Sequence, residues 1–113
     1  MDELDKGENY TVRDIELAEN GSLLVDWARA RMPVLAKLKE EAERTKPLAG
    51  MRVAGCLHVT KETAVLIEAI GAAGAEISWS GCNPLSTQDE VAAWLAREGY
   101  SVHAWHGQST EDF

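Results

Sequence analysis

The chain has 113 residues, of which 45% are hydrophobic and 27% are charged, and these values are ordinary for one compact domain with a hydrophobic core. Its formal net charge of −8 argues against binding to a nucleic-acid backbone, which requires clustered lysine and arginine. Two cysteines are too few for a disulfide framework, no apolar run reaches the ~20 residues of a membrane span, and the acidic start lacks a signal-peptide core. We therefore expect a cytoplasmic protein that binds neither nucleic acid nor membrane.

The first part of the chain predicts helices. A short helix is expected over residues 10–19, because Asn20-Gly21 is a typical helix stop and Ser22 is a typical N-cap for a second helix. The second helix continues the apolar spacing of a helix toward residue 45. It should break near Met32, because Pro33 has no N–H to donate to the preceding turn.

The middle of the chain predicts a strand followed by a helix. Residues 51–58 are short, mostly apolar and rich in small side chains, which is typical of a buried strand. Thr60 or Thr63 is a suitable N-cap for the helix that follows. That helix is apolar on nearly all sides, and Gly71 and Gly74 mark its end.

The last part of the chain repeats this alternation. A second strand is expected over residues 75–80, followed by a loop over residues 81–87. Thr87 and Glu90 have the spacing of a capping box, in which each side chain satisfies the other residue's backbone N–H. The helix that starts there should end at Gly99, and residues 100–105 read as a third strand.

The order of elements therefore predicts an α/β fold in which N-terminal helices are followed by a β-α-β-α-β parallel, Rossmann-like half sheet with helices on its faces. We expect residues 1–9 to be a flexible N-terminus and residues 10–113 to form the domain. Residues 106–113 resemble the start of a helix that is not completed. This suggests a fragment of a larger chain or one half of a split protein.

Ligands of such sheets bind beyond the carboxyl ends of the strands, where His58, Thr60 and Glu62 follow the first strand. An imidazole there can act as an acid or base, and a hydroxyl and a carboxylate can recognise the edge of a heterocyclic base. Each residue also has a structural reading. His58 can simply bond to backbone, Thr60 can be an N-cap, and Glu62 is favoured by the helix dipole alone.

Other chemistry is less well supported. Cys56, Cys82 and the three histidines contain no pair with zinc-ligand spacing, so the sequence predicts no metal site. Cys82 has no cationic neighbour in sequence that would activate it as a nucleophile. The loop over residues 80–87 precedes a helix but contains no lysine or arginine, so a phosphate site there is not favoured.

Two long strings then point to a known family. The strings AGCLHVTKETAVLIE, from residue 54, and CNPLSTQDEVAA, from residue 82, resemble the N-terminal substrate-binding region of the S-adenosylhomocysteine hydrolase family without gaps. The step Met32-Pro33 also fits the family. The resemblance covers roughly residues 12–113, which is nearly the whole chain.

The resemblance implies an NAD-dependent enzyme that reversibly splits S-adenosyl-L-homocysteine into adenosine and homocysteine. It further implies an acid, base or water-handling role for His58 and contacts to the nucleoside from Thr60 and Glu62, with the Glu62 carboxylate near the adenine amino group. Cys82 and Asn83 are expected to line the same cleft. The resemblance also implies that the full enzyme is a homo-oligomer.

The chain also departs from the family pattern. Further substrate and catalytic residues of the family have no counterpart here, and no G-x-G-x-x-G follows a strand. We therefore expect NAD to be bound by a domain absent from this chain, and the chain alone to be inactive without the remainder of the enzyme or a companion chain. Two alternatives stay open: a stand-alone module that binds a nucleoside or a protein without catalysis, and a preference for inosyl-homocysteine.

Overall fold

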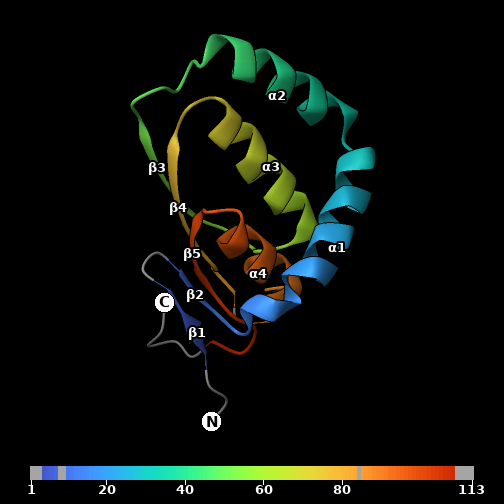
Figure 1. The fold of residues 1–113 in the computed structure, drawn as a ribbon, viewed down its shortest axis with the longest axis vertical. Coiled ribbons are helices and arrows are strands. Elements are labelled where there is room, and N and C mark those ends of the chain that lie inside the picture. The colour runs from blue at the N-terminus through green and yellow to red at the C-terminus, as the bar shows by residue number, and fades with distance from the viewer. Residues whose placement is uncertain (1–3, 8–9, 84, 109–113) are drawn as a thin grey trace.

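The computed structural model describes residues 4–7, 10–83 and 85–108, and this part of the chain forms one five-stranded sheet in the order β1-β2-β5-β4-β3 (Figure 1). Strands β2, β5, β4 and β3 are parallel, and β1 pairs antiparallel with β2. The prediction of an α/β fold with a parallel β-α-β-α-β half sheet is confirmed. The elements are β1 (Asp5–Lys6), β2 (Tyr10–Val12), the 3-10 helix η1 (Ile15–Leu17), α1 (Ala18–Ala30), α2 (Pro33–Thr45), β3 (Arg52–Cys56), α3 (Lys61–Ala72), β4 (Glu76–Ser80), α4 (Asp89–Arg97) and β5 (Ser101–Ala104).

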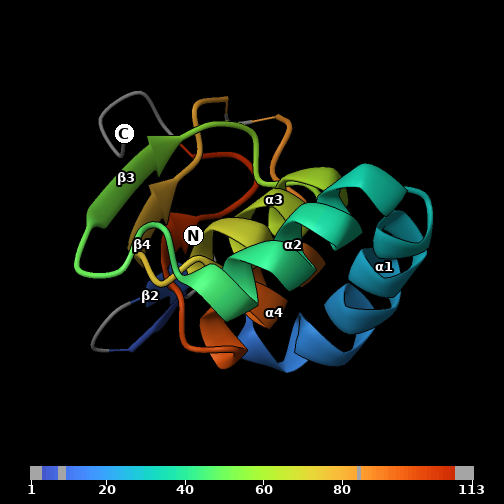
Figure 2. The same ribbon diagram turned by 90° about the horizontal axis from the view of Figure 1, so that it is seen from above.

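All the α-helices of the described residues lie on one side of the sheet, in two layers (Figures 1 and 2). Helices α3 and α4 pack against the strands, and α1 and α2 pack on the outer side of α3 and α4. The helices expected on the sheet faces therefore lie on one face in this part of the chain. From β3 to β4 to β5 the chain moves in one direction, and right-handed crossovers in one direction place α3 and α4 on the same face. The connection from β2 to β3 runs the other way, and its helices α1 and α2 pack on α4 and α3 on this same face. None of these helices has the length and apolar character needed to traverse a bilayer.

The N-terminal region differs most from the prediction. The helix expected over residues 10–19 is wrong, because Tyr10–Val12 forms a strand that pairs with β5 and only the single 3-10 turn η1 precedes α1. Val12 is fully buried, so strand pairing and burial together outweigh the local helical pattern. Asp5–Lys6 pairs with β2, residues 1–3 and 8–9 lie outside the described part, and the domain boundary at residue 10 stays a prediction.

Close packing explains why the helix end predicted at Asn20-Gly21 is wrong. Gly21 lies inside α1, and a Cβ placed on it would lie 1.9 Å from the carbonyl oxygen of Glu90 in α4. The glycine is therefore needed where two helix backbones meet, not where a helix ends. The break expected near Met32 is confirmed, since α1 ends at Ala30 and α2 begins with Pro33 as its first residue.

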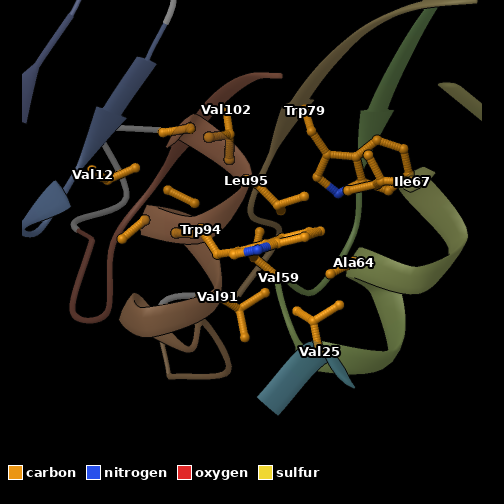
Figure 3. Packing of buried hydrophobic residues seen from close by; sticks show 14 of the residues in the cluster. Val12, Val25, Val59, Ala64, Ile67, Trp79, Val91, Trp94, Leu95 and Val102 are labelled. Carbon is orange, nitrogen blue, oxygen red and sulfur yellow. The ribbon is translucent and has the colours of Figure 1, made fainter. Parts of the chain in front are cut away.

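The core extends from the sheet through the layer formed by α3 and α4 to the buried side of α1, which contributes Val25 (Figure 3). Trp79 from β4 and Trp94 from α4 are each only 4% exposed and supply the largest side chains of this core. A Cβ on Gly55 would lie 2.2 Å from the Trp79 ring, so the ring fills the space that this glycine leaves. Strand β3 was expected to be buried, but it lies at the edge of the sheet and its alternate residues are exposed.

Candidate functional site

The joint between β3 and α3 lies at the carboxyl edge of the sheet and carries the predicted site residues. After Cys56 the chain passes through Leu57, His58 and Val59 before α3 begins at Lys61. Val59 is fully buried in the core, whereas His58 is exposed. The buried valine therefore fixes the joint, and the imidazole stays accessible to a ligand.

The loop that follows β4 is bonded to this joint. Nδ1 of His58 shares a hydrogen bond of 2.6 Å with the hydroxyl of Ser86. The same hydroxyl donates to the carbonyl oxygen of Asn83 at 3.2 Å, and the Asn83 side chain accepts from the Leu85 N–H at 2.8 Å. His58 and Asn83 are therefore brought together through Ser86, although they are far apart in sequence.

Gln88 fastens the end of the same loop to the start of α3. Its backbone N–H donates to the carbonyl oxygen of Val59 at 2.9 Å, and its side-chain oxygen accepts from the backbone N–H of Lys61 at 2.9 Å. These two bonds hold the first turn of α3 against the start of α4. The position of the residues that follow β3 is thus set by a residue distant in sequence.

Thr60 is the N-cap of α3, which confirms one of the two residues predicted for that role. Its hydroxyl oxygen accepts from the backbone N–H of Thr63 at 3.5 Å and lies 3.2 Å from the Thr63 hydroxyl. Capping takes one of the two acceptor sites of the hydroxyl. The donor site bonds to the Glu62 carboxylate and the Thr63 hydroxyl lies at the second acceptor site, so a ligand contact at Thr60 would replace one of these local bonds.

Glu62 stands in the first turn of α3, and its carboxylate lies 3.2 Å from the Lys61 ammonium. Burial would raise the pKa of this carboxyl, but hydrogen bonds from its own backbone N–H, from Lys61 and from the Thr60 hydroxyl outweigh burial and leave the pKa below its usual range. The side chain is 52% exposed. Glu62 is therefore an ionised acceptor at neutral pH with a face open to solvent.

The two cysteines are both exposed and free. The Cys56 thiol donates to the carbonyl oxygen of Gly81 at 3.6 Å, which ties the end of β3 to the first residue after β4. Cys82 and Asn83 are exposed in the loop beyond β4, at the same edge of the sheet as His58. This adjacency is compatible with the cleft-lining role expected of Cys82 and Asn83, which stays a prediction.

The capping box expected between Thr87 and Glu90 is wrong. The N-cap of α4 is Gln88, which makes no side-chain capping bond. The Thr87 hydroxyl is buried and without a partner, because the side chain turns toward Gly81, where an added Cβ would lie 3.1 Å from it. The pattern therefore located the start of α4 correctly but assigned its residues the wrong role.

The described residues do not fit NAD or a phosphate at the start of α3. Such a site needs free backbone N–H groups at a helix N-terminus. Here the Lys61 N–H is taken by Gln88, the Thr63 N–H by Thr60, and the Glu62 N–H by its own carboxylate. The described part of the chain also contains no cluster of histidine, cysteine or acidic side chains able to hold a metal ion.

Sequence reasoning missed Ser86 and Gln88, the two residues that connect the loop to the β3–α3 joint. Both lie in the run Ser86-Thr87-Gln88, which has the composition of a helix start. Their actual partners, His58 and Lys61, are 28 and 27 residues away in sequence. A local pattern contains no signal for such contacts.

Comparison with known proteins identifies the family of the chain. The family model for S-adenosyl-L-homocysteine hydrolase matches residues 9–113. The chain is 50% identical over 105 residues to an adenosylhomocysteinase of Sulfolobus acidocaldarius, covering 93% of this chain and 25% of that protein. It is 51% identical over 106 residues to the adenosylhomocysteinase of Aeropyrum pernix, covering 94% and 26%.

A relative named for another substrate matches to a similar extent. The S-inosyl-L-homocysteine hydrolase of Methanopyrus kandleri is 48% identical over 104 residues, covering 92% of this chain and 24% of that protein. The chain thus spans about a quarter of the length of the curated relatives that it matches. From its family match and these identities, the chain belongs to the S-adenosyl-L-homocysteine hydrolase family.

Proposed function

We propose that this chain is the nucleoside-binding portion of an adenosylhomocysteinase, an NAD-dependent enzyme that reversibly splits S-adenosyl-L-homocysteine into adenosine and homocysteine in the cytoplasm. Membership of the hydrolase family supports the reaction. The observation that carries the nucleoside assignment is Glu62, an ionised and accessible carboxylate beside the Thr60 hydroxyl. The chain acts with the remaining part of the enzyme, which supplies the NAD site and forms the homo-oligomer.

Glu62 suits an exocyclic amine because a carboxylate only accepts hydrogen bonds. Adenine offers such an amine. The hypoxanthine ring of inosine has a carbonyl oxygen there, which would face the Glu62 carboxylate without a proton between them. A hydrogen bond to a charged group contributes about 1.5–3 kcal/mol, which corresponds to roughly 10- to 150-fold in affinity.

His58 is assigned to acid, base or water handling beside the ribose. Its Nδ1 is engaged by Ser86, so the other ring nitrogen, Nε2, is the one available to exchange a proton with substrate or water. The Ser86 bond fixes the ring orientation, as an orienting partner does for a general base. Thr60 is expected to contact the nucleoside by exchanging one of the local bonds of its hydroxyl for a bond to the ligand.

The test uses the complete assembly. This chain is co-expressed with the part of the Sulfolobus acidocaldarius enzyme that it does not match, NAD is supplied, and homocysteine release and adenosine binding are measured. We expect Glu62→Ala to weaken adenosine binding about 10- to 150-fold. Glu62→Gln is the matched control, because its amide can donate to a carbonyl and should shift the preference toward inosine. Unchanged adenosine affinity in both variants would rule out the assigned role.

His58 is tested by separating turnover from binding. His58→Ala should lower turnover about 100- to 10,000-fold, the usual contribution of a positioned acid or base, while adenosine affinity changes little. Equal losses in turnover and affinity would contradict the assignment. Adenosine binding to the chain alone, combined with no homocysteine release by the assembly, would instead favour the stand-alone binding module.

A further inference from the structure

The side chain of Lys61 contacts both the carboxylate of Glu62 and the ring of Trp27. Its ammonium lies 3.2 Å from Oε1 of Glu62 and 5.3 Å from the centroid of the Trp27 ring. Lysine is usually among the most exposed residues, yet this side chain is only 23% exposed. A tryptophan of α1 therefore reaches the first turn of α3, directly beside the candidate nucleoside site.

The contact between Lys61 and Glu62 does not follow from their positions in the helix. Consecutive residues of an α-helix point about 100° apart and do not face each other. Fixing a lysine side chain in one conformation also costs rotamer freedom, and an unsupported ammonium extends into water. The face of a tryptophan ring attracts a cation that lies within about 6 Å of its centroid. The ring of Trp27 therefore explains why the ammonium stays beside Glu62.

Both ends of this arrangement are fixed by further contacts. The backbone N–H of Lys61 donates to the side-chain oxygen of Gln88 at 2.9 Å. The guanidinium carbon of Arg31 lies 3.9 Å from the centroid of the Trp27 ring, and its Nη1 donates to the Trp27 carbonyl oxygen at 3.4 Å. Trp27 is half-exposed, so these contacts, more than burial in the core, define where its ring lies.

The Glu62 carboxylate receives three local donors. They are the Lys61 ammonium, the Thr60 hydroxyl and the backbone N–H of Glu62 itself. Burial acts to raise the pKa of this carboxyl, and the three donors together outweigh burial and lower it. A carboxylate has about four acceptor sites, so one site is left for a donor from a ligand.

We propose that Lys61, supported by the ring of Trp27, is a positioning residue that holds the Glu62 carboxylate in the orientation that accepts a hydrogen bond from the nucleoside. The inference deepens the proposed function and rests on it, because the partner of Glu62 is the adenine amine. Lys61 acts through Glu62 and needs no contact with the substrate. A role in folding explains the arrangement poorly, because ion pairs with an exposed partner contribute little to stability.

Other charged groups surround this pair and have to be kept constant in a test. Arg31 of α1 stacks on the Trp27 ring, and His58 lies in the joint before α3. Glu90 of α4 lines the same surface hollow as Lys61. Variants that leave these three groups in place share their contributions at every pH, so a difference between variants reports on Lys61 and its support.

A direct test is the titration of the Glu62 side chain, followed by carboxyl carbon NMR in the 113-residue chain. This measurement requires neither NAD nor the rest of the enzyme. Lys61→Met removes the charge and keeps an apolar stem, and it should move the Glu62 midpoint to higher pH because the ionised carboxylate loses a donor. Lys37→Met is the matched control at an exposed position of α2, and it should leave the midpoint unchanged.

Variants of Trp27 separate the aromatic ring from simple apolar support. Trp27→Leu should move the Glu62 midpoint in the same direction as Lys61→Met but by a smaller amount, because the ammonium stays present and becomes mobile. Trp27→Phe retains an aromatic face, so it should move the midpoint less than Trp27→Leu does.

The effect on the ligand is measured as adenosine affinity in the complete assembly with the unmatched part of the Sulfolobus acidocaldarius enzyme. Lys61→Met should weaken adenosine binding about 2- to 5-fold, which is the size of a partly exposed ion pair. The loss should grow as the pH falls, because Glu62 becomes protonated at a higher pH in this variant. Lys61→Arg should restore the affinity, and turnover at saturating substrate should stay the same in both variants.

Specific results would overturn the inference. An unchanged Glu62 titration in Lys61→Met would do so, and equal titrations of Trp27→Leu and the unmodified chain would remove the role of Trp27. Adenosine binding that is weakened in Glu62→Ala but not in Lys61→Met would also overturn it and leave the proposed function intact. Unchanged adenosine binding in both variants, combined with a shifted Glu62 titration, would instead refute the proposed function.

Discussion

Gly21→Ala provides a sharp test of the packing between α1 and α4. The added Cβ would lie 1.9 Å from the carbonyl oxygen of Glu90 and 2.9 Å from Cβ of Trp94. The nearest atom belongs to the backbone, so no side-chain rotation relieves the clash, and α1 must move away from α4. We therefore expect Gly21→Ala to destabilise the fold even though alanine is the better helix former.

The magnitude follows from two opposing effects. Overpacking a close-packed interior costs about 1–3 kcal/mol, and a backbone clash lies at the upper end of this range. Replacing glycine with alanine inside a helix by itself stabilises the fold by about 1 kcal/mol. The net expectation is a free energy of unfolding lower by about 2 kcal/mol.

The assay is urea unfolding of the 113-residue chain, followed by circular dichroism and by the fluorescence of the buried residues Trp79 and Trp94. Gly71→Ala is the matched control, because Gly71 is also helical but its added Cβ would lie 3.1 Å from the ring of Tyr100, a side chain that can adjust. The control should stay within about 1 kcal/mol of the unmodified chain. Equal effects of the two variants would refute the backbone-clash argument.

Two further variants test electrostatics. Arg29 joins α1 to α3, because its Nε and Nη2 donate to one Glu68 oxygen at 3.1 and 2.7 Å. Arg29→Met should therefore lower the free energy of unfolding by about 1–2 kcal/mol, whereas Arg44→Met, at an exposed position, should leave it unchanged. Equal changes in the two variants that do not depend on salt concentration would contradict this expectation. Burial, together with the Glu68 and Glu98 carboxylates, raises the pKa of Tyr100. Its neutral form therefore contributes stability that is complete below about pH 10 and lost as the pH rises through the folded-state pKa. In urea titrations at alkaline pH, Tyr100→Phe should lose less stability than the unmodified chain does. Parallel losses of stability in the two proteins would refute this expectation.

Local chemistry made much of the fold predictable. The alternation of short apolar runs with helical spacing predicted β3, α3, β4, α4 and β5. The missing N–H of Pro33 predicted the break between α1 and α2, and the hydroxyl of Thr60 predicted the start of α3. These features depend on neighbours in the chain, so a single sequence is enough to determine them.

Contacts between distant residues decided the rest. Strand β2 forms because β5 offers an edge and the core buries Val12, and Gly21 stays helical because α4 approaches its backbone. The orientation of His58 depends on Ser86, which is 28 residues away. The sequence by itself determined the order of the elements from β3 to β5 and indicated the candidate site residues. Only the tertiary structure decided which sheet face is open and which strand is at the edge, because both depend on crossover direction and long-range pairing.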